Sequence, residues 1–186
     1  MRLLAVSGSL RAMSVNSALL RAAARLAPAG IEVQWCPDLG ALPLFNPDLE
    51  SDPPAAVQQF RASVAQAHAL LIASPEYAHG MTGTLKNALD WLVSFEPFAC
   101  KPVAVLNASP RAQHADAALR EVLTTMAAVI VEPASITLPL VGARLDEEGM
   151  VDTPAIATAL RAALQALVDA VAVGATPACA PASHRL

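Results

Sequence analysis

A group of residues able to bind an anion follows the first apolar run of the chain, Leu3–Val6. It consists of an arginine and several hydroxyl and amide side chains just before a helical pattern, namely Ser9, Arg11, Ser14 and Asn16. A helix N-terminus leaves backbone N–H groups unsatisfied and favours an anion, and a guanidinium suits phosphate oxygens. The segment therefore predicts a phosphate site. An ordinary capped turn, with Ser14 or Asn16 as N-cap and Arg11 in solvent, is the alternative.

A second loop with candidate binding residues follows the apolar run Ala69–Ala73. It reads Ser-Pro-Glu-Tyr-Ala-His-Gly from residue 74 to residue 80 and contains Tyr77, the single tyrosine of the chain. A tyrosine ring can cover a planar ligand, and glycine allows a backbone to approach a ligand closely. For Glu76 we expect the backbone to matter more than the carboxylate. His79 is either a ligand contact or a surface histidine, and the sequence leaves both open.

Short apolar runs alternate with amphipathic helical patterns along most of the chain. Runs that are apolar on both faces and end at turn residues are typical of strands buried on both sides. The five runs are Leu3–Val6, Ile31–Cys36, Ala69–Ala73, Val103–Leu106 and Val129–Val131, the last with a continuation at Ile136–Val141. This alternation predicts an α/β fold with a doubly wound, five-stranded parallel sheet and helices on both faces.

For five such units the flavodoxin-like strand order 2-1-3-4-5 is favoured. It places the ligand crevice between the first and third strands, beside both loops described above. We expect a single domain over residues 1–173. A flexible tail is expected over residues 174–186, because that segment is rich in Pro and Ala and has no periodic pattern.

Composition and charge exclude several classes of protein. With 55% hydrophobic and 15% charged residues, the chain is not disordered in general. A net charge of −4 without a basic run argues against nucleic-acid and polybasic membrane partners. The three scattered cysteines form no CxxC motif, so no metal site is expected. The first loop matches neither GxxxxGK[ST] nor GxGxxG, which disfavours an ATPase or a dinucleotide-binding Rossmann site.

The location of the protein is predicted from its apolar segments. The N-terminal apolar run is too short for the core of a signal peptide. The most apolar helical stretch, Leu160–Val173, contains Arg161 and Asp169 and is too short to span a bilayer. We therefore expect a cytoplasmic protein without a membrane partner.

Two motifs together resemble the NAD(P)H-dependent FMN reductase family, which includes quinone and chromate reductases. The first is Gly-Ser-Leu-Arg-x-x-Ser-x-Asn at residues 8–16. The second is Pro-Glu-Tyr at residues 75–77, followed by Gly-x-Leu-Lys-Asn-Ala-Leu-Asp-Trp at residues 83–91. The segment at residues 42–48 also resembles the family's loop after its second strand, and the resemblance runs to about residue 170. The chain departs from the family at Ala78, where many relatives have asparagine.

The resemblance implies a flavodoxin-like fold that binds FMN. It implies that the FMN phosphate is held by Ser9, Arg11, Ser14 and Asn16. It further implies that Pro75, Glu76, Tyr77 and His79 line the flavin ring and ribityl chain, largely through backbone groups, and that Ser109 lies beside the ring. The fourth loop departs from the family's Gly-rich turn. Its Arg111 and His114 attract the phosphates of the donor nucleotide, narrow the pocket, or lie in solvent at the helix start. Family members are usually dimers or tetramers, so a homodimer or homotetramer is implied.

The activity that the resemblance implies is two-electron reduction. NAD(P)H would pass a hydride to the flavin, and a quinone or another small oxidised acceptor would receive it; because the flavin carries this chemistry, no catalytic side chain is expected. Two alternatives stay open. A one-electron carrier of the flavodoxin type is disfavoured by the modest net charge and by Arg11. A non-catalytic phosphate- or nucleotide-binding module would explain the first loop but not the Pro-Glu-Tyr loop.

Overall fold

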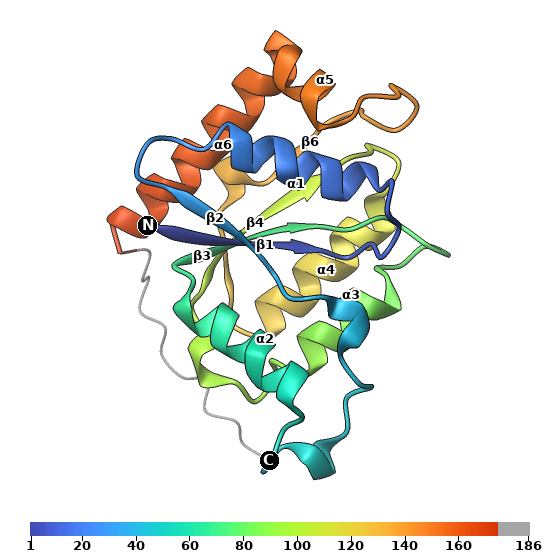
Figure 1. Ribbon diagram of the computed structural model, residues 1–186, viewed down its shortest axis with the longest axis vertical. Helices are drawn as coiled ribbons and strands as arrows, with labels where there is room; N and C mark the ends of the chain where they lie inside the picture. Colours follow the sequence, from blue (N-terminus) through green and yellow to red (C-terminus); the bar gives the residue numbers. More distant parts are fainter. Residues whose placement is uncertain (175–186) are drawn as a thin grey trace.

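A parallel β-sheet lies at the centre of the structure, between two layers of helices (Figure 1). The computed structural model describes residues 1–174. The strands are β1 (Arg2–Ser7), β2 (Glu32–Trp35), β3 (Ala69–Ala73), β4 (Pro102–Asn107), β5 (Val129–Ile130) and β6 (Ile136–Thr137). Their order is β2-β1-β3-β4-β5, with β6 also paired to β4, and this confirms the predicted order 2-1-3-4-5.

The fifth position of the sheet is divided between two short strands. β5 pairs with Pro102 and Val103 at the start of β4, whereas β6 pairs with Leu106 and Asn107 at its end. The 3₁₀ turn η4 (Glu132–Ala134) separates them. Its Pro133 has no backbone N–H to donate to a strand ladder. The apolar run that starts at Val129 therefore continues toward Val141 in two pieces.

Helices cover both faces of the sheet. They are α1 (Val15–Arg25), α2 (Ala55–Gln66), α3 (Gly83–Asp90), α4 (Gln113–Thr125), α5 (Glu147–Asp152) and α6 (Pro154–Ala172). Helices α1, α5 and α6 lie on one face, and α2, α3 and α4 lie on the other (Figure 1). The 3₁₀ turns η1 (Leu39–Ala41), η2 (Pro47–Leu49) and η3 (Glu96–Phe98) occur in the connections.

Alternate residues of each central strand enter two different cores, because successive side chains of a strand point to opposite faces. In β1, Leu3 and Ala5 pack into the core that contains α1 and α6. Leu4 and Val6 pack into the core that contains α2, α3 and α4. Both cores consist mainly of aliphatic side chains, as the low aromatic content of the chain requires.

Helix α6 is longer than the stretch Leu160–Val173 identified in the sequence, because it begins at Pro154. Within residues 1–174 it is the one helix long and apolar enough to cross a membrane by length and composition, so the expectation that it is too short was wrong. Its Leu160, Leu164 and Leu167 are buried in the core. The core helices of soluble proteins can be equally long and apolar, so the length and composition of α6 are weak evidence for a membrane span.

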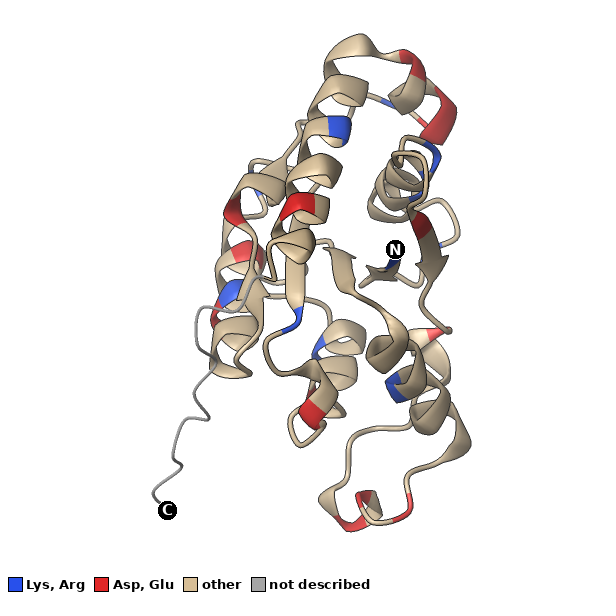
Figure 2. Ribbon diagram, turned by 90° about the vertical axis from the view of Figure 1, so that its left-hand side faces the viewer, with Lys and Arg blue, Asp and Glu red and all other residues tan. Residues whose placement is uncertain are grey.

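Positions of basic and acidic residues are interspersed along the ribbon, and several acidic residues lie at the end of the molecule that carries α5 (Figure 2). There Arg21 Nε lies 2.5 Å from the carboxylate of Glu147. The predicted tail at 174–186 lies outside the described residues apart from Gly174, so the domain boundary at residue 173 stays a prediction.

Candidate functional site

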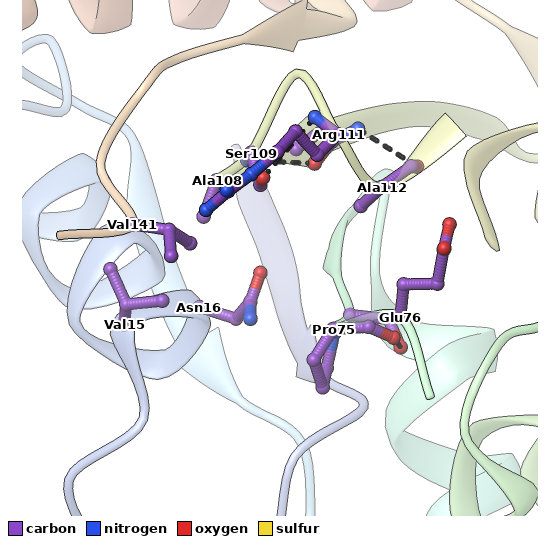
Figure 3. A pocket seen from close by; sticks show the side chains of 11 residues that line it. Val15, Asn16, Pro75, Glu76, Ala108, Ser109, Arg111, Ala112 and Val141 are labelled. Carbon is purple, nitrogen blue, oxygen red and sulfur yellow. Dashed lines mark hydrogen bonds between the residues drawn. The ribbon is translucent and has the colours of Figure 1, made fainter. Parts of the chain in front are cut away.

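A cavity of about 290 Å³ opens where the carboxyl ends of β3 and β4 face the first turn of α1 (Figure 3). It is lined by Val15, Asn16, Ser74, Pro75, Glu76, Asn107, Ala108, Ser109, Arg111, Ala112 and Val141. Four of the predicted site residues thus share one space, namely Asn16, Pro75, Glu76 and Ser109. They come from the first turn of α1, the loop after β3 and the loop after β4, which meet here because parallel strands end at the same edge of the sheet.

Asn16 presents a buried polar side chain to this cavity. The residue is 4% exposed, and its Oδ1 has no hydrogen-bond partner within residues 1–174. Its side chain lies between Pro75 and the loop that carries Ser109 (Figure 3). Leaving a buried polar atom unsatisfied costs about 1–3 kcal/mol. The position of Asn16 is therefore better suited to contact with a ligand than to a simple turn.

The capped-turn alternative is correct in part. Ser14 is the N-cap of α1, and its hydroxyl oxygen accepts a hydrogen bond of 3.3 Å from the Ser17 N–H. The side chain of Arg11 is exposed. A serine hydroxyl that accepts one hydrogen bond can still donate another to a ligand. Capping by Ser14 and anion binding at the same turn are therefore compatible.

The remaining residues of the first loop line two further hollows around the same turn. Arg11 and Ser14 line a hollow of about 430 Å³ between α1 and the segment after β6. Ser9 and Arg11 line a hollow of about 260 Å³ on the side of β2. The four predicted phosphate residues therefore surround one turn, but the structure does not place them all in a single cavity.

Gly8 allows the first loop to approach the loop after β3. A Cβ at Gly8 would lie 2.4 Å from Oγ and 2.7 Å from Cβ of Ser74. The Gly8 N–H donates to the Ala73 carbonyl at 2.8 Å, and the Thr82 hydroxyl donates to the Gly8 carbonyl at 2.6 Å. Thr82 also caps α3 by accepting from the Leu85 N–H at 3.2 Å. The contact with Gly8 was missed in the sequence, where only the preference of threonine for N-caps marks Thr82.

Tyr77 and His79 belong to a tight hairpin beside the cavity and do not line it. Tyr77 and Gly80 exchange two backbone hydrogen bonds of 3.0 Å. The residues between them, Ala78 and His79, have positive φ angles of 49° and 58°. Two successive left-handed residues are typical of a type I′ turn. The Tyr77 side chain is 59% exposed, so its ring is accessible at the surface.

Two contacts connect this hairpin loop to the start of α4. The Glu76 Oε2 atom accepts a hydrogen bond of 2.9 Å from the Ala115 N–H. The imidazole rings of His79 and His114 stack with centroids 4.4 Å apart and an interplanar angle of 23°. A carboxylate in the first turn of a helix is stabilised by the unsatisfied N–H groups and the helix dipole. The Glu76 carboxylate therefore holds α4 against the loop, in keeping with a structural role for this side chain.

Asn107 shapes the loop that carries Ser109 and was not identified from the sequence. Its buried side chain accepts from the Ser109 N–H at 2.9 Å and donates to the Ala112 carbonyl at 3.3 Å. The one available signal was its position as the first polar residue after the fourth apolar run. Arg111, in the same loop, lines the cavity and is exposed.

The helix motif after the hairpin anchors the segment at residues 42–48. Trp91 is fully buried, and its Nε1 donates to the Pro43 carbonyl at 2.8 Å. The Asn87 side chain donates to the same carbonyl at 3.0 Å and accepts from the Phe45 N–H at 2.8 Å. The rings of Phe45 and Trp91 meet edge to face with centroids 5.1 Å apart. These two motif residues therefore hold a loop in place and do not line the cavity.

Comparison with known proteins identifies the relatives of the chain. The family model for NADPH-dependent FMN reductase matches residues 1–142. An NAD(P)H-dependent FMN reductase of Pseudomonas aeruginosa is 44% identical over 111 residues, which are 58% of this chain and 60% of that protein. A quinone reductase of Escherichia coli (strain K12) is 37% identical over 106 residues, which are 55% of this chain and 56% of that protein.

A solved structure covers more of the chain. FerB, a flavoenzyme NAD(P)H:(acceptor) oxidoreductase from Paracoccus denitrificans, has a TM-score of 0.78 and 27% sequence identity, and the match covers 92% of this chain and 97% of FerB. The chain spans about three fifths of the length of the curated relatives cited above. The family match covers most of the chain and includes all the loops that form the cavity. The chain therefore belongs to the NADPH-dependent FMN reductase family.

Proposed function

We propose that this protein is an FMN-dependent NAD(P)H oxidoreductase that passes two electrons, by hydride transfer, to a quinone or another small oxidised acceptor. The observation that carries the proposal is the cavity at the carboxyl ends of β3 and β4, into which the buried Asn16 side chain points. Its Oδ1 has no hydrogen-bond partner in the described part of the chain. The names of the Pseudomonas and Escherichia relatives support the same activity. They do not favour a one-electron carrier or a non-catalytic module.

The residues around the first turn of α1 fit a phosphate monoester with a polar chain attached. We assign the FMN phosphate to Ser9, Arg11, Ser14 and Asn16. The Asn16 amide group can donate to a phosphate oxygen, while its unpartnered Oδ1 needs a donor such as a ribityl hydroxyl. The dipole of α1 and the exposed Arg11 guanidinium add positive charge at the same turn.

The ring and ribityl chain of FMN are assigned to Pro75, Glu76, Tyr77, His79 and Ser109. Bound FMN supplies the redox chemistry of the reaction. The protein's own residues position it: Thr82 and Gly8 join the two loops, and Glu76 holds the hairpin loop against α4. The exposed side chains of the Tyr77–Gly80 hairpin lie at the edge of the site, where donor and acceptor would enter.

We further propose a cytoplasmic homodimer or homotetramer. Several large apolar side chains are exposed on the described chain, namely Leu10, Met13, Leu44, Tyr77 and Val93. Met13 and Leu44 are 79% and 83% exposed. Exposed apolar surface on a soluble protein often marks an interface. Light scattering after size-exclusion chromatography tests this proposal, and a monomer at micromolar concentration would contradict it.

The decisive experiment is a visible absorbance spectrum of the FMN-loaded protein, recorded anaerobically before and after NADPH and then after a quinone. We expect a yellow protein whose flavin band bleaches with NADPH and returns with the quinone. A flavin band that NADPH and NADH leave unchanged would indicate a carrier or a binding module instead. Failure to bind FMN at micromolar concentration would contradict the proposed function.

A further inference from the structure

The hollow of about 430 Å³ adjoins the candidate cavity across the first turn of α1. The two spaces share Val15 and Val141, which lie on the same side of the cavity in Figure 3. One wall of the hollow is formed by α1 and the loop before it, and the other by the segment at residues 140–146. The hollow therefore extends the site from the turn that carries Ser14 toward a segment that none of the sequence motifs includes.

The segment at residues 140–146 is anchored to the loop after β4. The Leu138 N–H donates to the Asn107 carbonyl at 2.8 Å, and the Leu140 N–H donates to the Ala108 carbonyl at 3.0 Å. Both acceptors belong to residues that line the candidate cavity. The start of the segment thus has a defined position relative to the site.

Three guanidinium groups line the hollow, and they differ in their partners. They belong to Arg11, Arg21 and Arg144. The charge of Arg21 is compensated by the carboxylate of Glu147 at 2.5 Å. Within residues 1–174, neither Arg11 nor Arg144 forms an ion pair with a carboxylate. Two cationic side chains without carboxylate partners therefore face one space.

One carboxylate also lines the hollow. Asp146 is the N-cap of α5, and its Oδ1 accepts a hydrogen bond of 2.9 Å from the Gly149 N–H. Its negative charge is smaller than the combined positive charge of Arg11 and Arg144, so the wall of the hollow has a net positive charge. The positive end of the α1 dipole lies at the same place. The electrostatics of the hollow therefore favour an anion.

We propose that Arg144 is a second cationic residue of the FMN phosphate site and faces Arg11 across the phosphate. A phosphate monoester carries between one and two negative charges at neutral pH, which two guanidinium groups match better than one. The inference rests on the proposed function and adds a residue from the segment between β6 and α5. Arg144 binds the phosphate and does not contact the flavin ring.

The test compares the affinities of Arg144→Gln and the unchanged protein for FMN and for riboflavin, which lacks the phosphate. Both ligands are titrated by flavin fluorescence. We expect Arg144→Gln to weaken FMN binding about tenfold. This is the lower end of the range for losing a charge-assisted hydrogen bond, because solvent screens the exposed Arg144 side chain. Riboflavin binding stays unchanged. Arg144→Lys keeps the positive charge but lacks the paired N–H donors of the planar guanidinium. It should therefore weaken FMN binding less than Arg144→Gln does.

Arg161→Gln is the matched control, because Arg161 is an exposed arginine on α6 that lines none of the three hollows described above. It should bind both ligands as the unchanged protein does. If Arg144→Gln alters FMN and riboflavin binding equally, or alters neither, the inference is overturned while FMN binding itself stands. If the unchanged protein binds neither ligand, the proposed function fails and the inference fails with it.

Discussion

The Thr82 hydroxyl donates a buried hydrogen bond of 2.6 Å to the Gly8 carbonyl. This contact joins residues far apart in the sequence and connects the loop before α1 to the loop before α3. A Cβ at Gly8 would clash with the Ser74 side chain, so the two loops leave no room here for any residue other than glycine. This hydrogen bond therefore fixes the loop before α1 beside the loop that carries the Tyr77 hairpin.

Thr82→Val should reduce both stability and FMN affinity. The valine matches the shape of threonine but leaves the buried Gly8 carbonyl without this donor and the Leu85 N–H without its cap. The unsatisfied carbonyl alone costs about 1–3 kcal/mol. Thr82→Ser keeps the hydroxyl and should retain most of the FMN affinity. Urea unfolding and flavin titration of both variants measure the effect. Equal FMN affinities for the two variants would show that this hydrogen bond does not position the site.

Arg11→Ala should weaken FMN binding while leaving the fold intact. A charge-assisted hydrogen bond to a phosphate contributes about 1.5–3 kcal/mol, which corresponds to roughly a ten- to hundredfold change in affinity. The Arg11 side chain is exposed and makes no ion pair with another described residue, so its loss should not change the melting temperature. An unchanged dissociation constant in a flavin fluorescence titration would refute the role assigned to Arg11.

Glu76→Ala should destabilise the protein by about 1 kcal/mol, because the Ala115 N–H at the start of α4 loses its acceptor. Glu76→Gln retains a side-chain oxygen as acceptor, so it should lose less stability. Thermal unfolding of the two variants without ligand provides the comparison. A greater loss for Glu76→Gln than for Glu76→Ala would contradict the capping role.

Ala78→Gly should stabilise the hairpin beside the site. Ala78 has a φ of 49°, a left-handed conformation that costs an L-residue about 1 kcal/mol but costs glycine nothing sterically. The free energy of unfolding should rise by roughly 0.5 kcal/mol, because the relief of strain is partly offset by the larger conformational entropy of glycine in the unfolded chain. The control is Ala62→Gly at an exposed position of α2, which should destabilise by roughly 0.5–1 kcal/mol. Chemical denaturation of both variants should therefore give shifts of opposite sign.

Cys36 is partly buried and lines the hollow on the side of β2, and its thiol should nevertheless react slowly with alkylating agents at neutral pH. Burial raises the pKa of its thiol from an ordinary value of 9.0 to about 12, so very little thiolate is present near neutral pH. Because the folded pKa lies above the unfolded one, the thiol favours folding below pH 9.0, and this contribution disappears as the pH rises toward 12. Peptide mapping after iodoacetamide treatment, with and without urea, measures the protection. Rapid labelling of Cys36 in the folded state would contradict it.

The strand order could be predicted because alternating apolar runs and helical patterns along the chain leave few topologies open. The ligand crevice was expected between the first and third strands, whereas the cavity lies at the carboxyl ends of β3 and β4, against α1. Leu3–Val6 and Ala69–Ala73 read as strands buried on both faces, and in the structure both are. The end of the fifth strand does not follow from the sequence, because apolar residues occur on both sides of Pro133. The missing backbone N–H of that proline, and its place beside β4, divide the run into β5 and β6.

Details of the site depended on contacts that no local pattern contains. The residue types at Asn16, Glu76 and Ser109 indicated binding chemistry. Only the packed structure shows that these three residues share a cavity. It also shows that the Glu76 carboxylate accepts a hydrogen bond from the first turn of α4. Tyr77 is the single tyrosine of the chain and a candidate for covering a planar ligand. It lies at the start of the left-handed turn and does not line the cavity.

The amino-acid sequence by itself determined the alternation of strands and helices, the two loops that carry polar residues, and the family motifs. These are local properties, because hydrophobic periodicity and helix-start chemistry act over a few residues. The tertiary structure alone decided that Thr82 holds Gly8 and that Arg144 lines a hollow with Arg11. Such pairs are brought together by the packing of the whole sheet and its helices, so their proximity cannot be read from the residues beside them in the chain.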